Sequence, residues 1–159
     1  MGCKQSKLEN TNFNTPFYSL NGKTLNGKIV YVYDGDTLHI VFNIDNKFCK
    51  FNCRLINIDS PEIRTTNKKE HESAIKSRNY LLKKVTNISL INENLSKNDI
   101  KNICSESRKL ITVKCFEFDK YGRLLVELFD NNLSINNDMI NQKLAVKYDG
   151  GTKKQYTEI

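Results

Sequence analysis

The chain has 159 residues, of which 38% are hydrophobic and 27% are charged, and these values are typical of one globular domain. Its 25 lysines and arginines outnumber its 18 acidic residues, and the net charge of +7 favours an anionic partner such as nucleic acid or a membrane surface. No apolar run approaches the ~18 residues of a membrane-spanning helix, which argues against an integral membrane protein.

The five cysteines indicate a reducing, intracellular setting. Their number is odd, they form no Cys-x-x-Cys pair, and the sequence offers only two histidines as further metal ligands. These features argue against both a zinc site and a disulfide framework. The N-terminus also lacks the apolar segment of a secretory signal.

The first six residues, MGCKQS, fit the pattern for N-myristoylation, in which Gly2 receives the acyl chain once Met1 is removed. One myristoyl chain binds a membrane only marginally, so a second signal is expected, and palmitoylation of Cys3 could supply it. The alternative is a chance match in an unstructured tail. We predict lipidation at Gly2 and Cys3, a tail and linker over residues 1–26, and a lipid-anchored protein on the cytosolic face of a membrane, with a cytoplasmic location as the alternative.

Strand patterns begin near residue 28. Residues 29–33 are apolar and β-branched, residues 37–44 alternate between apolar and polar, and residues 48–58 are again strand-like. The short segments between them, Asp34-Gly35 and Asp45-Asn46, are typical turn sequences. The pattern predicts three consecutive antiparallel strands.

Helical and strand patterns then alternate. We predict a helix over residues 69–86, a short helix starting near Ser96, strands over 110–118 and 124–129, and a helix over 134–146. Five strands with interposed helices predict an α+β fold that is mainly β, a five-stranded OB-fold barrel with two or three helices. We place this domain at residues 27–148 and a short C-terminal tail at 149–159.

The turn at Asp45-Asn46 fixes which residues of the flanking strands face each other. Residue numbers of antiparallel partners sum to about 91, so Asp36 lies beside Arg54. Strict alternation would put Arg54 and Asp59 on opposite faces of one strand, and they share a site only if the chain bends between them. Pro61 favours such a departure from the sheet, because it has no N–H to donate.

The charged residues around these strands suit one kind of chemistry. Two aspartates and a main-chain carbonyl fit a hard cation such as calcium, which takes oxygen ligands. A neighbouring glutamate can act as a general base, and two arginines can grip a phosphate and stabilise the charge that develops during its attack. Together these groups point to cleavage of a phosphodiester bond.

The segments VYDGDT, RLINIDSPE and DKYGR stand in the order and spacing of the staphylococcal nuclease family, which the chain resembles over residues 27–148. The resemblance implies a calcium-dependent enzyme that cleaves DNA and RNA on the 5′-oxygen side and leaves 3′-phosphates. It assigns roles as follows: one calcium ion held by Asp36, Asp59 and the main-chain carbonyl of Ser60, with Asp34 supporting them; Glu62 as general base; Arg54 and Arg123 on the phosphate; and Lys120, Tyr121 and Tyr148 on the substrate.

The sequence also departs from the family's pattern. A stretch around residues 87–108 is an insertion relative to the family's pattern, and the family's long C-terminal helix has no counterpart. The alternative to an enzyme is a catalytically silent OB-fold module that binds nucleic acid or protein and is tethered to a membrane. Such modules typically lack the carboxylates or arginines, and these are present here. We expect a monomer, although the sequence does not fix the oligomeric state.

Overall fold

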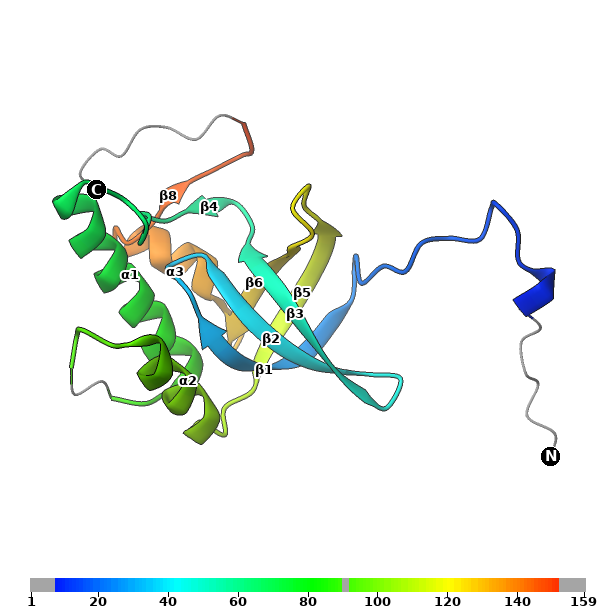
Figure 1. Ribbon diagram of the computed structural model, residues 1–159, viewed down its shortest axis with the longest axis horizontal. Helices are drawn as coiled ribbons and strands as arrows, with labels where there is room; N and C mark the ends of the chain where they lie inside the picture. The colour runs from blue at the N-terminus through cyan, green and yellow to red at the C-terminus, as the bar shows by residue number, and fades with distance from the viewer. Residues whose placement is uncertain (1–7, 90–91, 152–159) are drawn as a thin grey trace.

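The computed structural model describes residues 8–89 and 92–151. Its elements in chain order are η1 (Leu8–Asn10), β1 (Thr24–Val32), β2 (Thr37–Ile44), β3 (Lys47–Leu55), β4 (Ile58–Asp59), α1 (Lys68–Thr86), α2 (Lys97–Glu106), β5 (Ile111–Phe118), β6 (Leu124–Asp130), β7 (Leu133–Ser134), α3 (Ile135–Asn141) and β8 (Val146–Lys147) (Figure 1).

Five strands form a closed barrel. They are hydrogen-bonded in the order β3-β2-β1-β5-β6, and a parallel pairing of β3 with β6 closes the circle. Every second side chain along these strands points inward, and the barrel is filled by apolar groups: Ile29, Leu38, Ile40, Phe42, Cys53, Leu55, Ile111, Val113, Cys115, Leu124, Val126 and Leu128. The predicted five-stranded OB-fold barrel with helices is confirmed.

The β2–β3 hairpin has the register that the sequence predicted. Asp45 and Asn46 both adopt positive φ angles, 48° and 63°, as a two-residue hairpin turn requires. Partners run from Ile44 opposite Lys47 to Thr37 opposite Arg54, so each pair sums to 91. This register carries the end of β3 back to the start of β2, where the loop from β1 arrives.

The predicted strand over residues 48–58 is wrong in one respect, because the chain turns within it. β3 ends at Leu55, Asn57 adopts a left-handed φ of 65°, and the chain resumes as the short strand β4. The buried side chain of Asn136 holds this turn, since its amide nitrogen donates to the main-chain oxygen of Ile56 at 3.0 Å. β4 then leaves the barrel and pairs with β8 instead.

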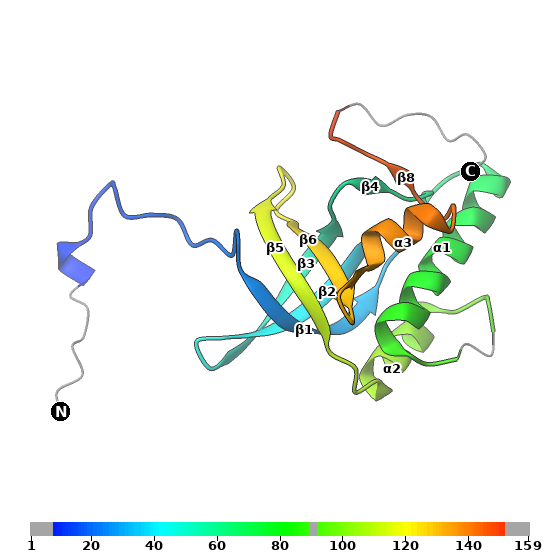
Figure 2. The same ribbon diagram turned by 180° about the vertical axis from the view of Figure 1, so that it is seen from behind.

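The helices pack on one end of the barrel, away from the N-terminal segment (Figures 1 and 2). α1 forms as predicted and buries one apolar face, made by Ala74, Leu81, Leu82 and Val85. α2 begins as predicted after Ser96, which forms a reciprocal capping box with Asp99.

Two element boundaries differ from the prediction. α3 ends at Asn141 rather than near residue 146, because Lys143 adopts a left-handed φ of 56° and terminates the helix. β1 starts at Thr24 rather than near residue 28, because its first residues pair with β5, as in Thr24 opposite Lys114. Leu20, which lies within the predicted linker, is fully buried.

The predicted lipidation sites Gly2 and Cys3 lie outside the described residues. In the part of the chain that the structure describes, none of the helices has the length and apolar character needed to cross a membrane.

Candidate catalytic site

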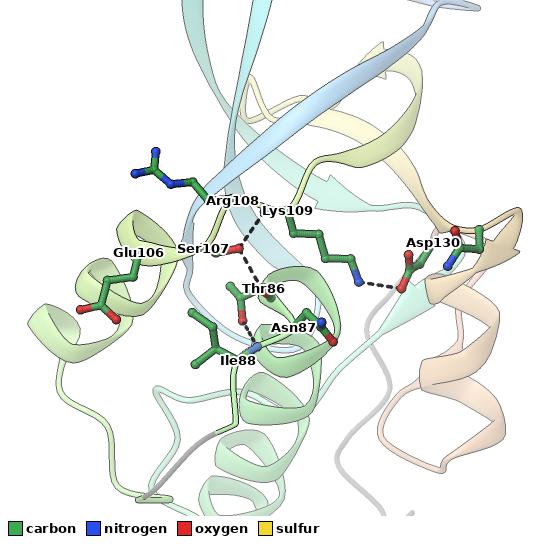
Figure 3. Close-up of a pocket in the computed structure, with 9 residues that line it drawn as sticks. Thr86, Asn87, Ile88, Glu106, Ser107, Arg108, Lys109 and Asp130 are labelled. Carbon is green, nitrogen blue, oxygen red and sulfur yellow. Dashed lines mark hydrogen bonds and ion pairs between the residues drawn. The ribbon is translucent and has the colours of Figure 1, made fainter.

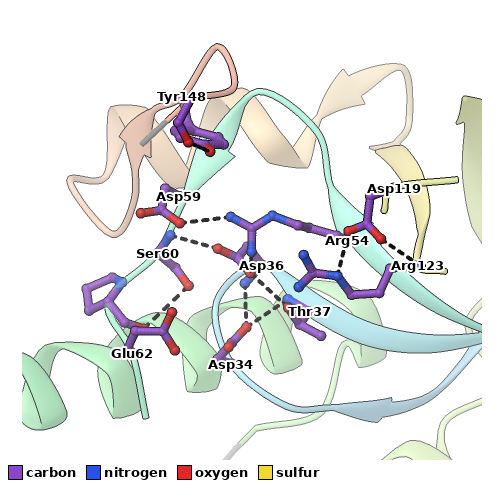
Figure 4. Close-up of polar contacts among 12 residues, drawn as sticks. Asp34, Asp36, Thr37, Arg54, Asp59, Ser60, Glu62, Asp119, Arg123 and Tyr148 are labelled. Carbon is purple, nitrogen blue, oxygen red and sulfur yellow. Dashed lines mark hydrogen bonds and ion pairs between the residues drawn. The ribbon is translucent and has the colours of Figure 1, made fainter. Parts of the chain in front are cut away.

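Three chain segments meet at one rim of the barrel. The loop between β1 and β2 carries Asp34 and Asp36, the end of β3 carries Arg54, and β4 carries Asp59, with Ser60 directly after it (Figure 4). The main-chain N–H of Leu55 donates to the main-chain oxygen of Asp36 at 2.8 Å, which extends the β2–β3 pairing into the loop. The rim is therefore built by backbone pairing.

Arg54 joins the two aspartates that the sequence singled out. Its Nη1 donates to Oδ1 of Asp36 at 2.9 Å, and its Nη2 donates to Oδ1 of Asp59 at 2.8 Å. Burial by itself would lower the pKa of Arg54, but the Asp36 and Asp59 carboxylates outweigh it and raise that pKa. The turn at Asn57 makes this possible, because it brings Asp59 to the same side as Arg54 despite the five-residue separation.

The aspartate loop is tied to β4 and folded tightly. Oδ2 of Asp36 accepts a hydrogen bond from the main-chain N–H of Ser60 at 2.8 Å. Asp34 turns back on its own loop, and its Oδ1 accepts from the N–H groups of Asp36 at 3.0 Å and Thr37 at 2.8 Å. Gly35 sits between them, and a Cβ there would come within 2.8 Å of the Ser60 Cβ. Position 35 therefore requires glycine, because any larger residue would collide with Ser60.

The rim carries an excess of negative charge. Asp34 is only 6% exposed, and its pKa rises to about 7, first because of burial and then because of the nearby Asp36 and Glu62 carboxylates. Arg54 is the one guanidinium that the described residues place in ion pairs with this cluster. Within the described residues, carboxylates gathered this closely favour a further positive ion beside Arg54.

The donor set fits a hard cation that completes its shell with main-chain oxygens and water. Among residues 8–89 and 92–151, no three histidine, cysteine, aspartate or glutamate side chains converge into a ready-made metal site. Asp36 and Asp59 each use one carboxylate oxygen to bind Arg54, so the two carboxylates alone offer few oxygen ligands to a metal ion. Calcium accepts six to eight oxygen ligands in flexible geometry, which suits such a partial set better than a metal that needs a rigid cage.

Glu62 follows β4 and lies near Asp34 on the same side of the cluster (Figure 4). Pro61 before it is buried, and the chain leaves the sheet here as the sequence suggested. The main-chain N–H of Glu62 donates to Oε1 of Glu70 at 3.2 Å, and the hydroxyl of Thr65 donates to Oε2 of the same residue at 2.7 Å. Glu70, in the first turn of α1, therefore orders the segment that carries Glu62.

Arg123 approaches from the β5–β6 turn (Figure 4). Parallel pairing aligns Arg54 with Leu125, so Arg123 belongs to the neighbouring end of β6. Its Nε donates to Oδ2 of Asp119 at 2.7 Å. Partial burial would raise the pKa of Asp119, but hydrogen bonds from Arg123 and Tyr121 outweigh it and lower that pKa. Arg123 is oriented by Asp119, and no hydrogen bond or ion pair joins it to the aspartate cluster in the described part of the chain.

The remaining predicted substrate residues lie on two sides of the cluster. Tyr121 is 73% exposed, with the Lys120 Nζ at 5.1 Å and the Arg123 Cζ at 5.4 Å from its ring centre. Tyr148 follows β8, and its ring centre lies 6.0 Å from Cζ of Arg54 (Figure 4). The pairing of β8 with β4 puts Tyr148 there, and its N–H donates to the main-chain oxygen of Asn57 at 3.0 Å.

A pocket of about 560 Å³ lies at the opposite end of α1, between the ends of α2 and β6 (Figure 3). Its main cation, Lys109, is already bonded to the main-chain oxygen of Lys84 at 2.8 Å and to Oδ2 of Asp130 at 2.6 Å. Thr86 at the end of α1 lines this pocket, whereas Gly35 of the aspartate loop packs against Ser77, nine residues or ~14 Å earlier along the helix.

Sequence reasoning missed two residues that hold the site in place. Glu70 binds the segment that carries Glu62. In the sequence, Glu70 is only an acidic residue in the first turn of a helix, and the favourable interaction with the helix dipole already accounts for such a residue. The side chain of Asn136 holds the bend before β4, and no sequence pattern indicated this role, because an asparagine near the start of a helix usually caps that helix.

Comparisons with known proteins identify the family of the chain. A family model described as staphylococcal nuclease homologue matches residues 52–159. A search of curated proteins found no match. The matched region contains Arg54, Asp59, Glu62 and Arg123, while Asp36 precedes it and joins the cluster through the β2–β3 pairing. The chain belongs to the family of staphylococcal nuclease homologues.

Proposed function

We propose that the protein is a calcium-dependent nuclease that hydrolyses DNA and RNA on the 5′-oxygen side of the phosphodiester bond and leaves 3′-phosphates. The observation that carries the proposal is the shared guanidinium of Arg54, which bridges Asp36 and Asp59 beside a third buried carboxylate. Family membership supplies the reaction class, and the cluster supplies side chains of the type that this reaction needs.

Asp36, Asp59 and the main-chain carbonyl of Ser60 would hold the calcium ion. When bound, the ion would polarise a phosphate oxygen and neutralise part of the charge of the cluster. Asp34 fixes the loop that carries Asp36, because it accepts two main-chain N–H groups of that loop.

The proton and the developing charge are handled by other side chains. Glu62 would take a proton from the attacking water, and it is held near the cluster through the bonds that Glu70 makes to its segment. Arg54 and Arg123 would donate to the phosphate oxygens as negative charge builds up on them. Arg54 would exchange one of its carboxylate partners for the phosphate, whereas Arg123 is already oriented by Asp119.

The nucleotide on either side of the cleaved bond has aromatic and basic neighbours. Tyr148 lies over Arg54, where a base could stack on its ring. Lys120 and Tyr121 lie at the exposed β5–β6 turn, from which they could contact a terminal phosphate.

The test is digestion of single-stranded DNA with calcium, with magnesium and with a chelator. We expect turnover with calcium alone and products that end in 3′-phosphates. Glu62→Gln and Arg123→Ala should each lower the rate by ~10²-fold or more, while Glu72→Gln, on an exposed position of α1, serves as the matched control. Equal rates in all three conditions would contradict the calcium assignment, and binding without any hydrolysis would favour the silent OB-fold module.

We also propose that the protein is acylated at Gly2 and Cys3 and is held on the cytosolic face of a membrane. The support is the MGCKQS sequence and the net charge of +7, which favours contact with anionic lipid. Intact mass of protein from eukaryotic cells should show a myristoyl group, and Gly2→Ala should remove it and shift the protein out of the membrane fraction. An unmodified Gly2 in such cells would contradict the proposal.

A further inference from the structure

Aromatic side chains line the outer face of β1 and β2 next to the catalytic rim. Val32 is fully buried, so its neighbours Tyr31 and Tyr33 lie on the other side of the chain, where both are half-buried and Tyr31 also packs against the core. The β1–β2 register sets Tyr31 opposite His39, with ring centres 5.4 Å apart. Tyr33 directly precedes Asp34, and the row of rings therefore begins at the aspartate loop.

Cations accompany these rings. Cζ of Arg64 lies 5.9 Å from the ring centre of Tyr33, and Nζ of Lys97 lies 5.9 Å from that of Tyr31. Arg78 of α1 also neighbours Tyr31, and their electrostatic interaction acts on the pKa of both groups. We call these residues the β1–β2 strip: Tyr31, Tyr33, His39, Arg64, Arg78 and Lys97.

Arg78 is the most unusual member of the strip. It is only 7% exposed, and its Nε and Nη2 both donate to the amide oxygen of Asn79, at 3.2 and 3.1 Å. In the described part of the chain no carboxylate forms an ion pair with it, and burial lowers its pKa. A buried charge without an opposite charge is costly for the folded state, so an external anion would relieve it.

The position of Lys97 also has no explanation in the stability of its own helix. It is the first residue of α2, where the helix dipole disfavours a positive charge. Ser96 and Asp99 already cap this end of the helix, so capping does not require Lys97. α2 lies in the segment 87–108 that is inserted relative to the family's pattern, and the insertion therefore brings a cation and a helix N-terminus to the strip.

We propose that the β1–β2 strip binds the part of a single-stranded nucleic acid substrate that extends beyond the cleaved bond. The exposed Arg64 and Lys97 contact its phosphates, the buried Arg78 adds positive charge beneath the strip, and Tyr31 and Tyr33 stack on its bases. This inference rests on the proposed function, because it extends the substrate path from the rim.

The spacing and chemistry favour a single strand. Tyr31 and Tyr33 are two strand residues apart, roughly 7 Å, so successive rings can engage successive unstacked bases. A duplex hides the faces of its bases, and it would leave the rings without partners. Rings combined with cations are the usual composition of surfaces that bind single strands without strong sequence preference.

The experiment compares two doubly substituted proteins that lose the same charge. The strip variant is Arg64→Ser with Lys97→Ser, and the control is Lys101→Ser with Arg108→Ser, two exposed positions outside the strip. Anisotropy titrations in chelator use single-stranded DNA of about 16 and about 4 nucleotides. We expect the strip variant to weaken binding of the longer strand by about 10-fold or more and to reduce the slope of log K against log salt by about 1.4, as two lost phosphate contacts require.

Four outcomes would contradict the proposal that the β1–β2 strip binds a single strand. These are equal losses in the two variants, an equal loss for the long and the short strand, no binding of the long strand by the wild-type protein, or a strip variant that loses binding only to anionic vesicles. Thermal melting checks that both variants are folded. Hydrolysis is not part of this test, so failure of the calcium-dependent reaction would reject the proposed function and leave the binding comparison to decide on the strip.

Discussion

Replacement of Arg54 by methionine tests whether this side chain holds the aspartate rim together. Its guanidinium is the shared partner of Asp36 and Asp59, and the side chains of Arg54 and Asp36 are 15% and 3% exposed. Removing one partner of a buried ion pair costs about 3–5 kcal/mol, because the remaining charge stays buried without compensation. For a chain of this size each kcal/mol lowers the melting temperature by about 3 °C, so we expect a fall of about 10 °C or more.

The assay is thermal melting in chelator and again with calcium. In chelator the variant retains the buried carboxylates without their guanidinium and should melt well below the wild type. Calcium should then raise the melting temperature of Arg54→Met more than that of the wild type, because a cation can replace the lost charge. Arg108→Met, at an exposed position, is the matched control and should change stability little. If Arg54→Met melts with the wild type in chelator, the ion pairs do not hold the rim.

Three further changes test other parts of the site. Gly35→Ala should lower stability by about 1–3 kcal/mol and reduce activity, because its methyl group meets Ser60 and Ser77. Gly22→Ala has open space but a left-handed φ of 79°, so it measures backbone strain without a clash and should leave activity unchanged; melting and activity together check this. Asp34→Asn keeps the acceptor oxygen and removes a carboxylate whose pKa is raised to about 7. Because the carboxyl pKa is raised in the folded state, ionisation of Asp34 destabilises the fold. In chelator the free energy of unfolding of the variant should equal that of the wild type below pH ~4 and exceed it by about 1–4 kcal/mol above pH ~7, as measured by denaturant titrations at several pH values. Asn136→Ala should lower the free energy of unfolding by about 2–3 kcal/mol in denaturant titrations, because it leaves buried main-chain groups without partners. An unchanged free energy of unfolding would mean that Asn136 does not hold the bend before β4.

The barrel could be predicted from the sequence because its signals are local. Alternating apolar residues indicated the strands, and Asp45-Asn46 fixed the register that puts Asp36 beside Arg54. The start of α2 was equally local, since Ser96 and Asp99 form a capping box that the sequence displays.

What could not be predicted depends on contacts between distant segments. The bend at Asn57, which lets Arg54 reach Asp59, is held by a side chain of α3 some 80 positions away. The β1–β2 strip was invisible for the same reason, because Arg78 and Lys97 meet Tyr31 only after two helices have packed beside β1. Those helices lie far from β1 in the sequence, so no local sequence pattern predicts their contact with Tyr31.

The central claim is that the rim made by Asp36, Arg54, Asp59 and Glu62 cleaves nucleic acid with the help of calcium. Hydrolysis of single-stranded DNA by the wild-type protein and by Asp36→Asn, each across a calcium titration, tests it most directly. The account predicts activity that rises with calcium in the wild type, and a variant that needs much more calcium or has no activity. Wild-type activity that persists in chelator, or an Asp36→Asn protein with the wild-type calcium response, would contradict it.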